Sequence, residues 1–167
     1  MDKRQVTQAG VTLVEVMIIV IILGIGAAMA VPNYLASTAR AQLRQAVTEL
    51  HGNLGLARMI AMNRNTTVTV TLSQVACPPA TSDCGRVLVT FTTVGGGAAM
   101  TPQVMPAEVR GVGGTSQIQF SSLGLRLGNG PPTQSMQLTN TYGVTYEIQV
   151  SSAGLTRWCA ASPCPPF

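Results

Sequence analysis

Charged residues are scarce in this sequence. Of its 167 residues only 10% are Asp, Glu, Lys or Arg, compared with about 25% in an ordinary soluble domain. The formal net charge of +4 argues against a protein that binds nucleic acid through bulk electrostatic attraction. A disordered chain is also excluded, because 46% of the residues are apolar and disorder requires low hydrophobicity together with high net charge. The length suits one modest domain.

The side chains that most enzymes need are missing or scattered. Lys3 is the only lysine and His51 the only histidine, and a single imidazole without a paired nucleophile makes no catalytic triad. The carboxylates after the apolar run form no pair along the chain: Glu49, Asp83, Glu108 and Glu147. The glycine clusters at 95–97 and 111–114 lack the following Lys-Ser/Thr or helix of a phosphate-binding loop, so we interpret them as flexible loops. The sequence therefore predicts no enzyme, no cofactor and no small-molecule substrate.

Only one long apolar run is present, which excludes a protein with several membrane-spanning helices. Residues 16–31 contain no polar side chain, and the run reaches back to Val11 with only Thr12 and Glu15 interrupting it. As a helix, this run would be roughly 30 Å long, about the thickness of a hydrocarbon core. We therefore expect residues 11–32 to form a hydrophobic helix that crosses a membrane once.

A short polar leader, residues 1–10, precedes the apolar run and carries Lys3 and Arg4. Basic residues before an apolar run keep that end of the chain in the cytoplasm. An ordinary secretory signal would place its small cleavage-site residues after the run, and Ala30 offers that alternative. The cleavage point that we favour lies before the run, after Gly10.

Glu15 does not fit a plain membrane anchor. A carboxylate at the centre of a membrane helix costs roughly 2.5–3.5 kcal/mol, less near an end, and indicates a function by default. If the chain is cut after Gly10, Val11 carries a free α-amine about one helical turn from Glu15. Glu15 could pair with this amine or with the amine of a neighbouring subunit. The plainer alternative is an interfacial glutamate that reaches the lipid headgroups.

The segment GVTLVEVMIIVIILGIGAAMAVPNYL, residues 10–35, resembles the type IV prepilin signature. The matching residues are Gly10 before the cut, then Val11, Thr12, Leu13 and Glu15, with the helix-weakening Gly24 and Pro32 further on. The resemblance implies cleavage after Gly10 by a prepilin peptidase and N-methylation of the new terminus. Val11 departs from the family, in which Phe is most common at this position.

The same resemblance implies a location and a role. The chain would be held in the inner membrane by one span, with its head in the periplasm, and would then assemble with other pilin or pseudopilin subunits into a filament, which could reach the cell surface. Residues 11–32 would form the membrane and filament-core helix, and Glu15, Thr12, Gly24 and Pro32 would serve assembly. A membrane-anchored periplasmic module that never polymerises is the alternative.

A second helical pattern follows Pro32, which would kink or break a helix interior at about 3 kcal/mol. Apolar residues recur at spacings of three or four: Leu35, Ala39, Leu43, Ala46, Val47, Leu50, Leu54, Ala57 and Ala61. This stripe predicts an amphipathic helix over residues 33–64 that packs on a sheet.

Alternation with a period of two predicts strands in residues 65–167. The predicted segments are Thr66–Ser73, Arg86–Thr93, Gln117–Phe120, Leu123–Leu127, Gln134–Leu138, Val144–Val150 and Leu155–Cys159. Glycine-containing turn signals at 95–97, 128–132 and 153–154 separate several of them. Short strands with such turns favour an antiparallel sheet. The predicted fold class is therefore α+β: a pilin-like fold in which a long N-terminal helix packs on an antiparallel β-rich head.

The head resembles the GspH/FimT branch of minor pilins and pseudopilins. The residues that carry this resemblance are Ala57, Arg58, Ala61, Arg64, Val68 and Val70 at the helix end, and Gly154, Arg157 and Cys159 in the last hairpin. It implies a structural subunit of a type IV pilus or type II secretion pseudopilus, at or near the tip. Some relatives that bind DNA carry Gly-Arg-x-Arg in this hairpin. Here Leu155 replaces the first of those arginines, so DNA uptake is the less favoured alternative.

Four arginines are the candidates for contact with nucleic acid: Arg40, Arg44, Arg58 and Arg157. Three of them, with His51, border the apolar stripe of the amphipathic helix. We favour the simpler interpretation that these side chains form a solvated border or contact neighbouring subunits.

Four cysteines are present: Cys77, Cys84, Cys159 and Cys164. A periplasmic head lies in an oxidising space, where disulfides are expected. Zinc is disfavoured because the spacings do not match common zinc sites and no histidine is near. Four cysteines allow three pairings, of which the local pairs, Cys77–Cys84 and Cys159–Cys164, are the simplest. No metal site is predicted.

Overall fold

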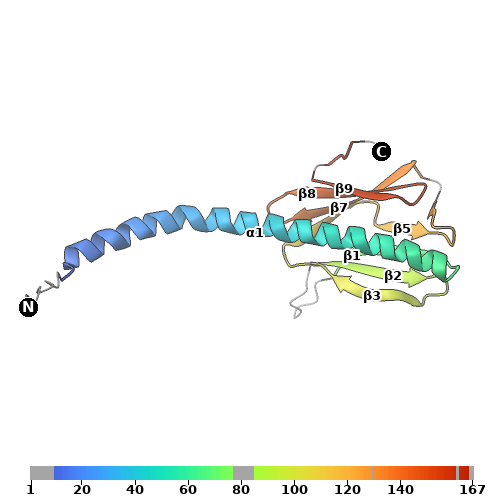
Figure 1. Cartoon of the computed structure of the whole chain (residues 1–167), viewed down its shortest axis with the longest axis horizontal. Coiled ribbons are helices and arrows are strands. Elements are labelled where there is room, and N and C mark those ends of the chain that lie inside the picture. Colours follow the sequence, from blue (N-terminus) through green and yellow to red (C-terminus); the bar gives the residue numbers. More distant parts are fainter. Residues whose placement is uncertain (1–9, 77–84, 129, 161, 166–167) are drawn as a thin grey trace, which may run out of the picture. The chain divides into compact units, whose positions relative to one another are not determined.

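The computed structural model describes residues 10–76, 85–128, 130–160 and 162–165 (Figure 1). The chain divides into two compact units, one ending at Ser37 and the other beginning at Thr38. The first unit contains the N-terminal part of the single described helix. The second contains the rest of that helix and all described strands, and we refer to it as the head. The predicted pair Cys77–Cys84 and the leader before Gly10 lie outside the described residues.

Helix α1 spans Leu13–Asn63 and includes Pro32 in its interior. The helix therefore continues through the proline. The side-chain amide of Asn33 donates a hydrogen bond to the carbonyl oxygen of Met29 at 3.3 Å, close to the position where proline removes a backbone donor. The bond goes to the carbonyl next to that of Ala28, which lacks its helical donor because Pro32 has no N–H.

The predicted apolar stripe is confirmed from Ala39 onward. The buried residues of α1 are Ala39, Leu43, Ala46, Val47, Leu50, Leu54, Ala57 and Ala61. Leu35, which we placed on the same stripe, is instead 49% exposed. It lies in the first unit, which contains no described strand.

The head contains two antiparallel sheets where the sequence predicted one. In the first, the strand order is β3-β2-β1-β5-β6, with β1 at Val68–Gln74, β2 at Val87–Thr93, β3 at Ala98–Val104, β5 at Gln117–Phe120 and β6 at Arg126–Leu127. In the second, the order is β4-β7-β8-β9, with β4 at Val109–Gly114, β7 at Thr133–Asn140, β8 at Thr145–Ser151 and β9 at Thr156–Cys159. The α+β class and the antiparallel pairing are confirmed.

Strand β4 corrects our interpretation of residues 111–114 as a flexible loop. Gly111 and Gly113 pair across the sheet with Thr139 and Gln137. A Cβ atom at Gly111 would lie 2.9 Å from the Thr139 Cβ, and one at Gly113 would lie 2.7 Å from the Gln137 side-chain oxygen. These glycines therefore allow β4 and β7 to approach closely. In the sequence, glycines of this kind resemble those of a flexible loop.

Two further strand predictions need correction. Strand β3 was missed because it has Pro102 within it, which is tolerated since β3 is at the edge of its sheet. The strand predicted over Leu123–Leu127 is reduced to β6, because Ser121 and Leu125 close a tight turn.

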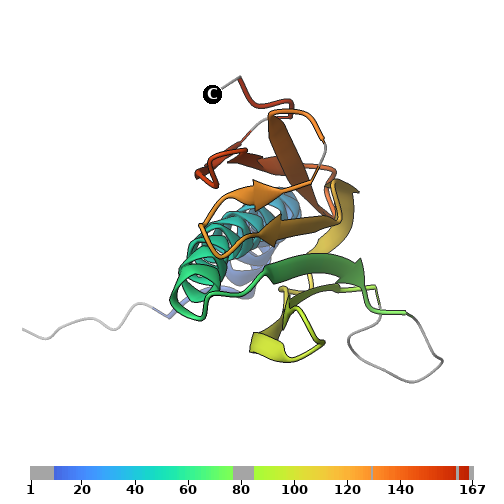
Figure 2. The same ribbon diagram turned by 90° about the vertical axis from the view of Figure 1, so that its right-hand side faces the viewer.

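One apolar core joins α1 to both sheets. It includes Leu50 and Leu54 from the helix, Phe91 and Phe120 from the first sheet, and Ile148 from the second. Figure 2 looks along the helix and shows strands of both sheets gathered around its head part. The buried face of α1 therefore packs in one core with both sheets.

Candidate functional site: the apolar helix and the head surface

The N-terminal end of α1 carries the predicted processing and assembly residues. Gly10 and Val11 are exposed and precede the helix. The Thr12 hydroxyl accepts a hydrogen bond from the Glu15 amide at 3.3 Å, and the Thr12 carbonyl accepts one from the Val16 amide at 3.2 Å. Thr12 is thus the N-cap of α1, and Glu15 stands at the third helical position, the spacing of a capping box. A carboxylate in the first turn also suits the helix dipole.

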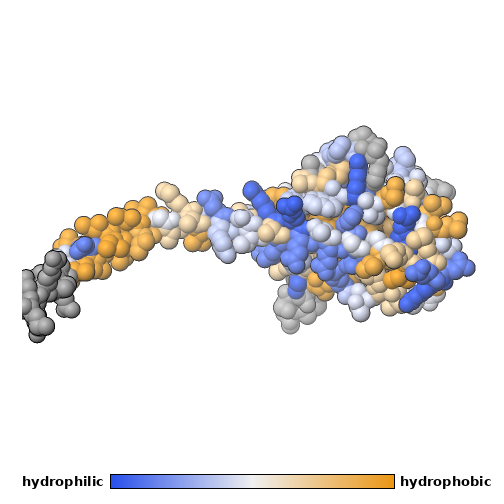
Figure 3. All heavy atoms as spheres, viewed as in Figure 1, coloured by the Kyte–Doolittle hydropathy of each residue, from blue (hydrophilic) through white to orange (hydrophobic). Residues whose placement is uncertain are grey.

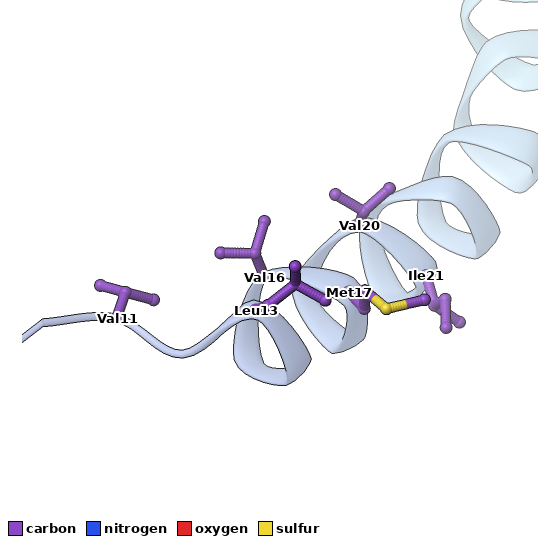
Figure 4. Close-up of a pocket in the computed structure, with 6 residues that line it drawn as sticks. All are labelled: Val11, Leu13, Val16, Met17, Val20 and Ile21. Carbon is purple, nitrogen blue, oxygen red and sulfur yellow. The ribbon is translucent and has the colours of Figure 1, made fainter.

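The first unit exposes an apolar surface along its whole length. Every described residue from Gly10 to Leu35 is exposed, and α1 is, within the described part of the chain, the helix long and apolar enough to cross a membrane. Figure 3 shows that apolar residues cover most of this segment. Figure 4 shows six of its side chains, which line an open hollow on the helix: Val11, Leu13, Val16, Met17, Val20 and Ile21. Such a surface needs lipid or other helices to cover it.

Gly24 and Pro32 both lie within this exposed helix. A Cβ atom built at Gly24 would meet no atom within 4 Å, so the chain itself does not require glycine there. Glycine weakens a helix interior by about 1 kcal/mol relative to alanine. Contacts within the described chain therefore do not explain why position 24 is glycine.

Arg58 is bound within the head. Its Nε donates to the carbonyl oxygen of Gly124 at 2.8 Å, and its Nη2 donates to that of Ala153 at 3.2 Å. A Cβ atom at Gly154 would lie 3.0 Å from the same Nε. The structure thus brings together Arg58 and Gly154, two residues on which the GspH/FimT resemblance rested, and gives them a common structural role.

Arg157 is also bound within the head. Its Nε and Nη2 donate to the Gln149 side-chain oxygen at 3.1 and 2.7 Å, and Nη2 also donates to the carbonyl oxygen of Pro165. The predicted disulfide between Cys159 and Cys164 is present, and it closes the loop that precedes Pro165. The guanidinium therefore holds the C-terminal segment against β8.

The other two arginines differ in their surroundings. The Arg44 guanidinium lies over the ring of Trp158 at 5.9 Å, and Trp158 in turn stacks on Tyr146 with ring centroids 5.9 Å apart. Arg40 is exposed on α1. His51 contacts Thr156 through its Nε2, 3.3 Å from the backbone oxygen and 3.1 Å from the hydroxyl. Arg44 and His51 therefore connect α1 to β9, which is a structural role within the head.

Glu147, which has no carboxylate near it in the sequence, is buried and accepts several hydrogen bonds. Only 3% of it is exposed, and its carboxylate accepts hydrogen bonds from Gln149 at 3.1 Å, Ser162 at 3.0 Å and Gln137 at 3.4 Å. Burial acts to raise the pKa of Glu147, but these three side-chain hydrogen bonds outweigh it and lower the pKa. The nearest sequence signal was the Cys159–Cys164 spacing, because that loop brings Ser162 to the carboxylate.

The comparisons with known families cover both units. Residues 46–154 match the family described as type II transport protein GspH. Residues 6–31 match the prokaryotic N-terminal methylation motif.

The curated relatives match only over a short segment. Two fimbrial proteins of Pseudomonas aeruginosa are 54% identical over 43 residues, which is 26% of this chain and 28% of each relative. The type II secretion system core protein G of Vibrio cholerae is 46% identical over 48 residues, which is 29% of this chain and 33% of that protein. The matched segment thus spans only about a third or less of their length.

Solved structures resemble most of the chain. Two crystal forms of the Pseudomonas aeruginosa type IV minor pilin FimU align with TM-scores of 0.51 and 0.52. They cover 74% and 77% of this chain and 97% and 96% of theirs, at 16% and 18% identity. At this identity the likeness shows the fold alone.

Proposed function

Because this chain belongs to the GspH family, whose match covers residues 46–154, we propose that it is a minor pilin or pseudopilin: a structural subunit built into a type IV pilus or a type II secretion pseudopilus, at or near the tip. The family and the fold are those of pilin subunits, which are structural proteins. The partners of this chain would be other pilin or pseudopilin subunits, and before assembly the inner membrane.

The exposed apolar helix is the observation that carries this proposal. Every residue from Val11 to Val31 is exposed in the described structure. The same surface suits lipid before assembly and neighbouring helices afterwards, since lipid tails and apolar side chains are similar environments. A single helix can therefore move from membrane to filament without a large change in its surroundings, which is what a pilin must do.

Glu15 would select the register between neighbouring helices, which apolar packing alone selects only weakly. Apolar helices slide past one another at little cost in lipid, whereas a buried charge pair can fix register even where its net stability is small. Cleavage after Gly10 would create the Val11 amine as the partner, either in the same subunit or in its neighbour. The N-cap hydrogen bond, which the Glu15 amide donates to the Thr12 hydroxyl, holds the first helical turn that presents Glu15.

Processing would precede assembly. Gly10 and Val11 are exposed and outside the helix, which supports access by a prepilin peptidase. N-methylation of Val11 would follow from the match to the methylation motif. The bound arginines of the head, Arg58 and Arg157, support the structural role over DNA uptake.

Replacement of Gly10 tests the proposal. In cells that assemble the filament, the unmodified chain should appear in sheared filaments with Val11 as its N-terminal residue. Gly10→Trp should accumulate as membrane-held, uncleaved precursor and be absent from filaments. Gly24→Trp is a bulky-residue control within the helix, and it should be cleaved normally. A mature chain that starts near Val31 would contradict the proposal.

A further inference from the structure

Two turns of the head are copies of one another in sequence and in hydrogen bonding. Residues 121–125 read SSLGL and residues 151–155 read SSAGL. In each turn the first serine accepts from the amide of the final leucine through its hydroxyl, at 3.2 and 3.1 Å. The amide of each first serine donates to the carbonyl of that leucine, at 2.8 and 2.9 Å. Each glycine has positive φ, +73° and +75°, so both turns have the same local geometry.

Arg58 joins the two turns. It donates to Gly124 in one turn and to Ala153 in the other. The turns touch, because a Cβ atom at Gly154 would lie only 2.1 Å from the carbonyl oxygen of Gly124. Met62 closes the junction from the helix, with its sulfur 2.7 Å from a Cβ atom built at Gly124. The end of α1 and the two turns therefore form one connected surface.

The exposed side chains at this junction are apolar. They are Met62 at 41%, Leu123 at 75%, Leu125 at 45% and Leu155 at 56%, and we call this set the twin-turn surface. Figure 3 shows apolar side chains at the end of the head where α1 terminates. Single exposed leucines are ordinary, but several exposed apolar side chains on adjoining segments are typical of a contact site.

The charges near the twin-turn surface have one sign. The exposed Arg64 follows the end of α1, two residues after Met62, and the partly exposed Arg58 donates to both turns. The described carboxylates of the head lie elsewhere. Glu49 precedes Arg58 by about 13 Å along the helix, while Glu108 and Glu147 bind Thr141 and Ser162.

A symmetric pair of copies is disfavoured by this arrangement. Joining two twin-turn surfaces would place arginine against arginine, and opposed like charges reduce affinity. The complementary partner has an apolar centre and carboxylates at its rim.

We propose that the twin-turn surface docks the head of a different pilin-type subunit, one that presents an apolar patch bordered by Asp or Glu. This inference rests on the proposed function for the kind of partner. The contact differs from the one that α1 makes through its N-terminal part. It would determine which subunit follows this one in an assembly.

A photo-crosslinking experiment in cells tests the docking. Benzoylphenylalanine is introduced into the full chain at Leu123, at Leu155 and, as the control, at Val94, an apolar residue that is 72% exposed in the turn between β2 and β3. Adducts at 123 and 155 should contain a second, different protein whose peptides identify it as a prepilin-type subunit. Position 94 should give no such adduct. Self-adducts at 123 and 155, or equal adducts at all three positions, would overturn the proposal.

Charge substitution tests the chemistry of the partner. Leu155→Glu should reduce the adduct formed at 123 by about tenfold or more, as expected for an anchor residue, because it brings a carboxylate to an acidic rim. Leu155→Lys should reduce it less, and Val94→Glu should leave it unchanged. Equal loss in the Glu and Lys variants would refute the acidic rim.

The two proposals fail in different ways. If the unmodified chain is recovered in filaments but positions 123 and 155 give no adduct, the docking surface is wrong and the proposed function stands. If the adducts form but the chain never appears in filaments, the proposed function is wrong.

Discussion

Gly154 and Gly143 form a matched pair of substitutions. Both glycines have positive φ, +75° and +76°, so alanine is strained at either position. They differ in the space around them: a Cβ atom at Gly143 meets nothing within 4 Å, whereas one at Gly154 lies 2.1 Å from the Gly124 carbonyl oxygen. The difference between the two alanine variants therefore isolates the junction of the twin turns.

The expected magnitudes follow from these surroundings. Left-handed backbone costs a non-glycine residue roughly 1–2 kcal/mol, so Gly143→Ala should lower the free energy of unfolding by about that much. Gly154→Ala carries the same strain and must also push the two turns apart. That movement breaks or lengthens the hydrogen bonds of Arg58 to Gly124 and Ala153, and bonds from a charged donor contribute about 1.5–3 kcal/mol each when buried. Because Arg58 is partly exposed, we expect an additional loss of about 2–3 kcal/mol.

Urea unfolding of the full chain in detergent measures both variants. Trp158 is the only tryptophan, and its position in β9 makes its fluorescence a probe of the head. Gly154→Ala should have the lower midpoint, at an unchanged slope. Arg58→Met should be destabilised in the wild-type background but only slightly in the Gly154→Ala background, since the two changes act on the same bonds. Equal destabilisation by Gly143→Ala and Gly154→Ala would refute the reasoning.

Three further predictions concern the other parts of the molecule. Glu15→Ala should be cleaved and inserted normally but be depleted from sheared filaments, because the register-selecting charge is lost; recovery at wild-type levels would exclude that role. The lowered pKa of Glu147 means that its ionised form stabilises the head near neutral pH, so this contribution should disappear as the pH falls below about 4.5 through the folded-state pKa. Glu147→Gln should therefore be less stable at pH 7 and have a flatter acid limb in urea titrations, and parallel profiles would contradict this. Duplex DNA should not shift the mobility of the full chain at about 0.15 M salt, because the guanidinium groups of Arg58 and Arg157 already bind acceptors within the head; a shift at that salt concentration would contradict this account.

Local patterns along the sequence determined the elements of this protein. The three-and-four spacing from Ala39 to Ala61 predicted the buried helix face, because a helix turns at a constant rate and its stripe must meet a core. The alternation of polar and apolar residues predicted β1, β2 and β5, because successive side chains of a strand point to opposite faces and one face must meet the core. The apolar run from Val11 to Val31 could also be predicted, because its composition alone favours an apolar environment over water. The close cysteine spacing predicted the Cys159–Cys164 disulfide, which the structure contains.

Only tertiary structure decided which of these local pieces meet. Gly111 and Gly113 looked like a flexible loop, and their reason for being glycine is a neighbouring strand 20 or more residues away. The two SSxGL turns are separated by 30 positions, and nothing in either turn says that they touch or that Arg58 bridges them. Glu147 looked isolated until the disulfide loop brought Ser162 to it. Contacts of this kind depend on how the helix and both sheets share one core, and that packing is a property of the whole chain that no local pattern encodes.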